Sequence, residues 1–290
     1  MNPRVLRSVT SLFAGLVLAT GLSAQAPAGL QFPAASPSAT LKQRIGVTDV
    51  EIDYSRPSMR GRKVFGGLQP YGEVWRTGAN TATKITFSTP VKVNGTPLAA
   101  GAYEVFTIPG ETEWTVIFHK NMSQWGAYAY DEKNDVARVK ATPAKLSQPV
   151  ETFTIGFENL SNEASATLTF AWENTSVSVK IDTDVVAELQ PKIEAAMAAE
   201  GKKPYFSAAM FYYENNLDRK QAAEWMDAAI AANPDAFYMI YRKGLILAKM
   251  GDKAGALAAA QKSLEMSKKQ KGAIRDEYVR LNEALIAKLQ

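Results

Sequence analysis

The chain has no cysteine and only one histidine among its 290 residues. The absence of cysteine excludes disulfides, thiolate zinc sites, iron–sulfur clusters and thiol nucleophiles. A single histidine excludes metal sites built from several imidazoles and leaves one imidazole for acid–base chemistry. We therefore expect no metal and no cofactor. The functions that remain are binding modules and enzymes that work with carboxylates.

The chain also lacks a strong charge excess, with 33 basic and 29 acidic side chains, so we do not expect it to bind nucleic acid.

Its apolar run over residues 9–22 is shorter than the roughly 20 residues that span a bilayer. Arg4 and Arg7 precede this run and small residues follow it, so residues 1–24 predict a secretory signal peptide cleaved after Ala24. We expect export in a Gram-negative bacterium, to the periplasm or cell surface, with no membrane span after cleavage.

Two different periodicities divide the mature chain, beginning after a linker predicted over residues 25–40. From residue 41 to 181, apolar and polar residues alternate, as they do around Val50, Ile52 and Tyr54. Such alternation is typical of half-buried antiparallel strands. About nine such runs, separated by turn residues, predict an all-β domain that is an antiparallel β-sandwich or jelly-roll-like.

From residue 182 to 290 the composition changes to strong helix formers, which predicts an all-α second domain. Within residues 203–270, apolar and small residues recur with a spacing of 34, so that Ala222 of one unit matches Ala256 of the next, while Lys243 and Lys268 depart from the pattern. This pattern resembles the tetratricopeptide repeat, in which two antiparallel helices cross closely at small residues. The resemblance implies an array of helical hairpins. A plain helical bundle with accidental spacing is the alternative.

Residues 54–80 predict a long loop rather than a strand, because their glycines and prolines allow tight bends. The segment also contains a cluster of cations. Long ordered loops on β scaffolds often carry binding sites. Arginine offers a planar fork to anions, and aromatic rings offer flat surfaces to sugars or peptides. The candidate ligand-binding residues in this loop and after residue 120 are Arg56, Tyr71, Trp75, Arg76, Asn80, Trp125 and Tyr128. The competing interpretation is that Arg76 and Asn80 bond the loop's own carbonyls while the aromatic rings belong to the core.

Other polar residues give weaker signals, and no catalytic residue is assigned. His119 stands at the end of a predicted strand, where a lone histidine is usually exposed or hydrogen-bonded. The acids Glu51, Asp53 and Glu104 lie on predicted strands and could converge as a carboxylate pair. Alternation by itself places them on the outward face.

Three separated stretches carry a family resemblance: YSRPSMRGRKVFGGLQPYGEVWRTGANTAT, LAAGAYEVFTIPGETEWTVIFHK and QWGAYAYDEKNDVARV. Over about residues 37–181 they resemble an exported bacterial family, domain-of-unknown-function family 2911. The resemblance implies a secreted β domain, sometimes followed by helical repeats. It implies no established activity, so no catalytic residue is carried over.

The hypothesis that we favour is a non-enzymatic exported protein of the cell envelope. Its β domain would bind an anionic or sugar-like ligand, and its helical domain would contact a protein or peptide partner, as helical repeats do on their concave face. One rival is a glycan-directed carboxylate hydrolase of the envelope. A second is a purely structural or assembly factor, in which the loops only pack.

Overall fold

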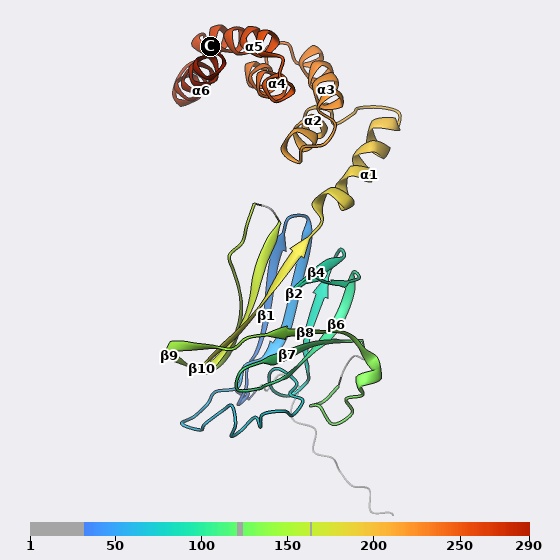
Figure 1. Cartoon of the computed structure of the whole chain (residues 1–290), viewed down its shortest axis with the longest axis vertical. Coiled ribbons are helices and arrows are strands. Elements are labelled where there is room, and N and C mark those ends of the chain that lie inside the picture. Colours follow the sequence, from blue (N-terminus) through green and yellow to red (C-terminus); the bar gives the residue numbers. More distant parts are fainter. Residues whose placement is uncertain (1–31, 121–123, 163) are drawn as a thin grey trace, which may run out of the picture.

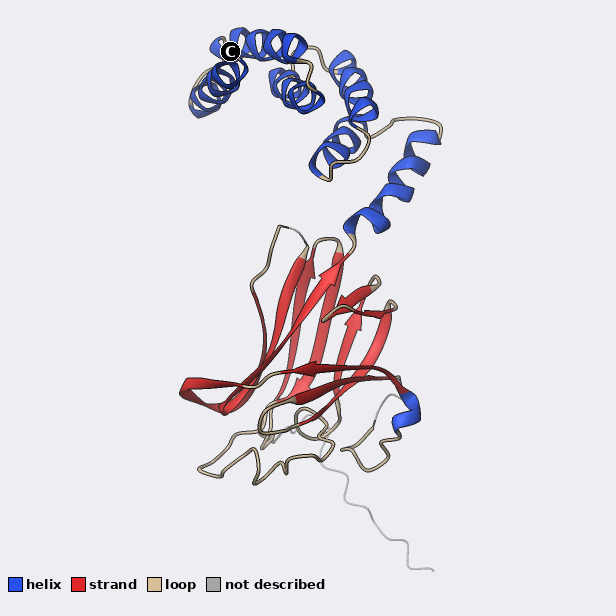
Figure 2. Ribbon diagram, in the orientation of Figure 1, coloured by secondary structure: helices blue, strands red, loops and turns tan. Residues whose placement is uncertain are grey.

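The computed structural model describes residues 32–120, 124–162 and 164–290. Within them, antiparallel sheets occupy residues 38–183 and six helices occupy residues 185–289 (Figure 1). The predicted order, an all-β domain followed by an all-α domain, is therefore confirmed. Figure 2 shows the strands and the α-helices separated in space, with one helix between them, while a short 3-10 helix, Glu132–Asn134, lies within the β part. The predicted signal peptide lies outside the described residues.

One sheet contains six antiparallel strands in the order β1-β2-β3-β6-β7-β8. The strands are β1 (Ser38–Ile45), β2 (Thr48–Ser55), β3 (Thr83–Phe87), β6 (Gly101–Ile108), β7 (Trp114–His119) and β8 (Asp135–Ala141). The first strand thus begins inside the segment predicted as a linker, residues 25–40. Ser38 pairs with Ser55 and Thr40 with Asp53. Strand pairing is made by backbone N–H and C=O groups, so it can extend into a segment without an apolar pattern.

The second sheet contains four antiparallel strands in the order β5-β4-β10-β9. They are β4 (Val91–Val93), β5 (Thr96–Leu98), β9 (Ala144–Glu158) and β10 (Ser165–Thr183). The last strand ends at Thr183, two residues beyond the predicted boundary. Asp182 and Thr183 still pair with β4, so backbone hydrogen bonding extends the strand past its last apolar residue.

The two sheets pack on a single hydrophobic core to which both contribute side chains. On β7, the alternate residues Trp114, Val116 and Phe118 point into this core, as the sequence pattern predicts. Their neighbour Ile117 faces the other way and is also fully buried, in a smaller cluster with Phe106 of β6. The six-stranded sheet is therefore covered on both faces at β6 and β7, which simple alternation does not predict.

The long segment between β2 and β3, residues 56–82, closes one end of the sandwich. It contains isolated bridges but no helix or extended strand. Two of its aromatic residues, Phe65 and Trp75, are each 4% exposed within the main core. Trp75 stacks on Trp172 of β10 with ring centroids 5.7 Å apart, and its Nε1 donates to Gly78 O at 3.0 Å. This segment lies at the end of the sandwich opposite the helices (Figure 1).

A single residue, Asp184, separates the last strand from the first helix. The helices are α1 (Val185–Ala198), α2 (Tyr205–Glu214), α3 (Arg219–Ala232), α4 (Phe237–Met250), α5 (Lys253–Lys268) and α6 (Ala273–Leu289). Asp184 caps α1 by accepting a hydrogen bond from Ala187 N at 2.9 Å. From α2 onward each helix packs against the next one along the chain.

A 34-residue offset relates α3 to α5. The N-caps Asp218 of α3 and Asp252 of α5 are 34 residues apart, and each accepts backbone hydrogen bonds from the first turn of its helix. Ala222 and Ala256, also 34 apart, are both completely buried. The periodic residues therefore occupy equivalent structural positions in α3 and α5.

We expect Trp75→Ala to lower the free energy of unfolding of the β domain by about 3–5 kcal/mol, because it opens a cavity against Trp172. Trp125→Ala is the matched control. Its side chain is 63% exposed, so its cost should stay within about 0.5 kcal/mol. Urea denaturation followed by tryptophan fluorescence would measure both. Equal effects of the two substitutions would contradict the proposed role of Trp75.

Candidate functional site

Two segments far apart in sequence meet at the loop end of the sandwich. Ala82 N donates to Gln124 O at 3.0 Å, and Gly126 N donates to Asn80 O at 3.2 Å. The same carbonyl of Asn80 accepts a second hydrogen bond, from Arg76 Nη1 at 2.9 Å. Residues 80–82 and 124–126 therefore form a short paired ribbon, and Arg76 is fastened to it.

Residues 124–128, which continue from this ribbon, carry two large aromatic side chains that are exposed to solvent. Trp125 is 63% exposed and Tyr128 is 87% exposed, and we call these two residues the aromatic rim. The Tyr128 ring lies against Gly126, where a Cβ atom would come within 2.7 Å of the ring and 3.2 Å of Arg76 Nη1. The structure thus brings together four of the predicted residues: Arg76, Asn80, Trp125 and Tyr128.

The other three predicted residues lie elsewhere. Arg56 donates to Phe153 O at 3.1 Å and to Thr154 Oγ1 at 2.7 Å, so it attaches the loop to β9. Trp75 is part of the core. The Tyr71 ring lies against Gly66 at the tip of the loop.

Donors of the loop also hold the chain that enters the first strand. Arg60 Nη2 donates to Ala35 O at 3.3 Å, and Asn80 Nδ2 donates to Ser36 O at 3.4 Å. The backbone N–H of Arg56 donates to the next carbonyl along this segment, Pro37 O, at 2.9 Å. Three consecutive carbonyls are thereby satisfied. Arg56, Arg76 and Asn80 each donate a side-chain hydrogen bond to a backbone carbonyl of the protein. These contacts agree with the interpretation in which loop residues satisfy the protein's own carbonyls.

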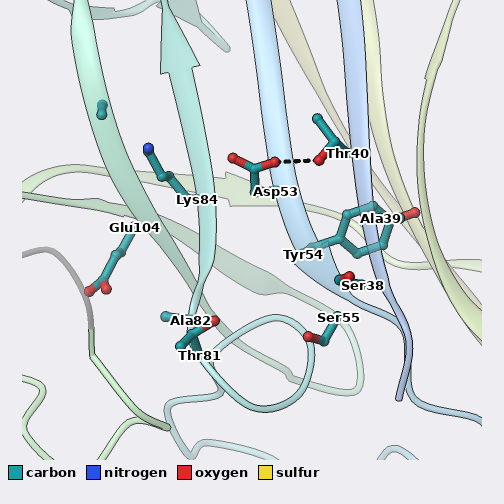
Figure 3. Close-up of a pocket in the computed structure, with 11 residues that line it drawn as sticks. Ser38, Ala39, Thr40, Asp53, Tyr54, Ser55, Thr81, Ala82, Lys84 and Glu104 are labelled. Atoms are coloured by element: carbon teal, nitrogen blue, oxygen red, sulfur yellow. Dashed lines mark hydrogen bonds between the residues drawn. The ribbon is translucent and has the colours of Figure 1, made fainter. Parts of the chain in front are cut away.

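Beside the rim, the outer face of the six-stranded sheet has a depression of about 560 Å³, which we call the strand hollow (Figure 3). It is lined by Ser38, Ala39, Thr40, Asp53, Tyr54, Ser55, Thr81, Ala82, Lys84, Ala102 and Glu104. The hollow and the rim are contiguous, because Thr81 of the lining forms a β-bridge with Trp125.

A row of polar residues crosses this face of the sheet, one on each strand. In register from β1 to β8 the row is Thr40, Asp53, Lys84, Glu104, His119 and Asp135. Lys84 was not among the residues predicted from the sequence. Only strand pairing reveals the row, because its members are scattered over nearly a hundred positions of the chain.

Lys84 is half-buried in the hollow, and no described residue forms a hydrogen bond or ion pair with its ammonium group. Asp53 lies beside it and accepts a hydrogen bond from Thr40 Oγ1 at 2.6 Å. Glu104 neighbours Lys84 on the other side of the row, but its carboxylate turns away from Lys84 (Figure 3). Lys84 therefore presents to the hollow a donor that no described residue of the protein engages.

Glu104 instead anchors the segment that carries the rim. It is 2% exposed, and its two oxygens accept hydrogen bonds from Gln124 N and Gln124 Nε2, each at 2.7 Å. Gln124 Nε2 also lies 3.3 Å from His119 Nδ1, while His119 Nε2 lies 3.2 Å from Asp131 O. A proton on Nε2 fits these two contacts, because Nε2 then donates to Asp131 O and Nδ1 accepts from Gln124 Nε2. His119 is completely buried. Of the two usual cases for a lone histidine, exposed or hydrogen-bonded, it is therefore the second.

The segment 124–130, which carries the rim, is also held by hydrogen bonds at its other end. Tyr130 OH donates to Asp135 Oδ2 at 2.6 Å, and Arg138 Nη1 donates to the same oxygen at 2.9 Å. Burial, reinforced by the Asp135 carboxylate, raises the pKa of Tyr130 well above its ordinary value. Tyr130 therefore stays a neutral hydrogen-bond donor. Both ends of the segment that carries the rim are anchored to the polar row.

Among the described residues, no cluster of three or more histidine or carboxylate side chains could hold a metal ion. In the same part of the chain, no helix is long and apolar enough to cross a membrane.

Comparison with known proteins identifies the β domain. A family model described as protein of unknown function (DUF2911) matches residues 36–181, which is half of the chain. The chain therefore belongs to this family. No curated protein matches the chain.

We expect Glu104→Gln to lower the free energy of unfolding of the β domain by about 2–3 kcal/mol. The new amide would place a donor against the donors of Gln124 and remove a charge-assisted hydrogen bond. Hydrogen exchange at the Gln124 and Gly126 amides should accelerate. Asp53→Asn is the control from the same row and should cost less than about 1 kcal/mol. Unchanged exchange in the Glu104 variant would exclude the anchoring role.

Proposed function

We propose that this member of the DUF2911 family is a non-enzymatic, exported binding protein of the cell envelope. Its ligand site would be the strand hollow together with the aromatic rim. The observation that carries this proposal is Lys84, a half-buried residue of the hollow whose ammonium has no hydrogen-bond or ion-pair partner among the described residues. An ammonium that is not engaged by the protein can donate to a ligand that supplies acceptor atoms.

The rival hydrolase is less well supported by the same geometry. Asp53 and Glu104 both line the hollow, but glycoside hydrolysis requires two carboxyl groups that both reach the substrate. Glu104 is 2% exposed and uses both oxygens on Gln124, while Lys84 stands between the two acids in the register. This arrangement favours binding over carboxylate chemistry.

A thermal-shift screen of the full mature chain would test the ligand site, with sugars, amino acids, carboxylates and inorganic phosphate as probes. We expect at least one class to raise the unfolding temperature of the wild type and to lose this effect in Lys84→Ala. The control is Lys42→Ala, because Lys42 lies on the same sheet but forms an ion pair with Glu51. The site is excluded if no probe distinguishes the two variants. Glycan turnover that depends on Asp53 would favour the hydrolase.

For the helical domain we propose a tetratricopeptide-like scaffold that binds a protein or peptide partner. The 34-residue offset of the caps Asp218 and Asp252 supports the repeat assignment. Between α2 and α4 there is a depression of about 420 Å³, which Phe206, Met210 and Arg242 help to line. Apolar side chains beside a cation and the carboxylate of Glu214, which also lines the depression, suit an extended peptide segment.

A photo-crosslinking residue at Tyr238, which is 36% exposed on α4, would test both the partner and the export in intact cells. We expect an adduct in the periplasmic or surface fraction. The mass of the crosslinked chain should be that of residues 25–290 plus the partner. The control position is Glu224, an exposed residue of α3. Equal labelling from both positions would argue against a defined partner surface. A chain that keeps residues 1–24 would contradict signal-peptide cleavage.

A further inference from the structure

The geometry points to a ligand class for the site proposed above: an uncharged or amino-bearing saccharide of two or more sugar units. This inference rests on the proposed function, because it assigns an occupant to the same hollow and rim. In it, one sugar unit lies over Lys84 and Asp53, and another packs on the indole of Trp125.

The charges around the hollow disfavour an anion. Its lining includes two carboxylates, Asp53 and Glu104, against the single ammonium of Lys84. Arginines would be the usual ligands of a carboxylate or phosphate. Of the nearby arginines, Arg56 donates to β9 and Arg76 to Asn80 O. An anionic ligand would therefore meet repulsion from Asp53 with one lysine to offset it.

The polar groups in the hollow match hydroxyls instead. Ser38, Thr40 and Thr81 contribute hydroxyl groups, which can both donate and accept. Asp53 supplies acceptors and Lys84 supplies donors on the same surface (Figure 3). A sugar ring carries several hydroxyls, each of them a donor and an acceptor, so it can satisfy such a mixed set. An amino sugar would in addition find the Asp53 carboxylate.

The rim supplies the apolar part of such a site. One face of a pyranose ring is lined by C–H groups, and an exposed indole gains free energy when such a surface covers it. Trp125 is 63% exposed although its backbone is bridged to Thr81 and its neighbour Gln124 is held by Glu104. An aromatic surface that is held in place before binding loses little entropy when a ligand covers it.

The spacing along the strand sets the minimum length of the ligand. Lys84 and Thr81 are three residues apart, which corresponds to about 10 Å of extended chain, and Trp125 is bridged to Thr81 across one strand spacing, about 5 Å to the side. On this backbone spacing, a ligand that covers both Lys84 and Trp125 is expected to need more than one sugar ring. Affinity should therefore rise sharply between one and two or more units.

Isothermal titration of the full mature chain would test this inference. The probes are linear oligomers of one to four units of glucose, of N-acetylglucosamine and of glucosamine, with galacturonate oligomers and inorganic phosphate as anionic comparisons. We expect at least one neutral or amino series to bind, with affinity increasing at least tenfold from one unit to three. Trp125→Ala and Lys84→Ala should each weaken binding at least tenfold.

Lys42→Ala and Trp225→Phe are the matched controls, since Lys42 is ion-paired and Trp225 lies in α3. Unchanged unfolding temperatures would show that the weakened variants are folded. Binding of only the anionic probes, lost in Lys84→Ala, would overturn the saccharide inference but preserve the proposed function. Failure of every neutral and amino oligomer to bind, or binding that is insensitive to Trp125, would also overturn it.

Discussion

The insertion of Trp75 between the sheets is the contact on which the rest of the β domain's loop end depends. Trp75 stacks on Trp172 and meets Phe153 and Trp114 edge-on, so a segment without regular secondary structure shares the main core. The residue that follows, Arg76, is thereby brought to Asn80, whose carbonyl also receives Gly126. The exposed Trp125 is positioned by this chain of contacts, which begins in the core.

The second constraint is the burial of polar groups on the outer face of the sheet. Glu104 and His119 are shielded from water by the segment after β7, and that arrangement is stable only because Gln124 and Asp131 satisfy them. Lys84, in the same polar row, has no such partner among the described residues. One row therefore has two roles: its buried half holds a loop, and its open half faces solvent.

Sequence reasoning succeeded where side-chain periodicity follows directly from backbone geometry. The alternation around Val50 and Ile52 predicted strands, and the 34-residue spacing placed Ala222 and Ala256 at equivalent buried positions. It failed where a second segment covers an element. Ile117 faces away from the main core and yet is buried, because packing by a distant segment leaves no local pattern. For Trp75 the sequence left ligand binding and the core as alternatives, and Trp75 lies in the core.

The amino-acid sequence by itself determined the two kinds of backbone, their order, and the long interruption between β2 and β3, since each depends on residues close together in the chain. Tertiary structure alone decided that Arg56 faces β9, that Arg76 and Trp125 lie together, and that Lys84 stands between two acids. The reason is that strand register joins residues distant in sequence, and register is set by the whole core rather than by any one segment.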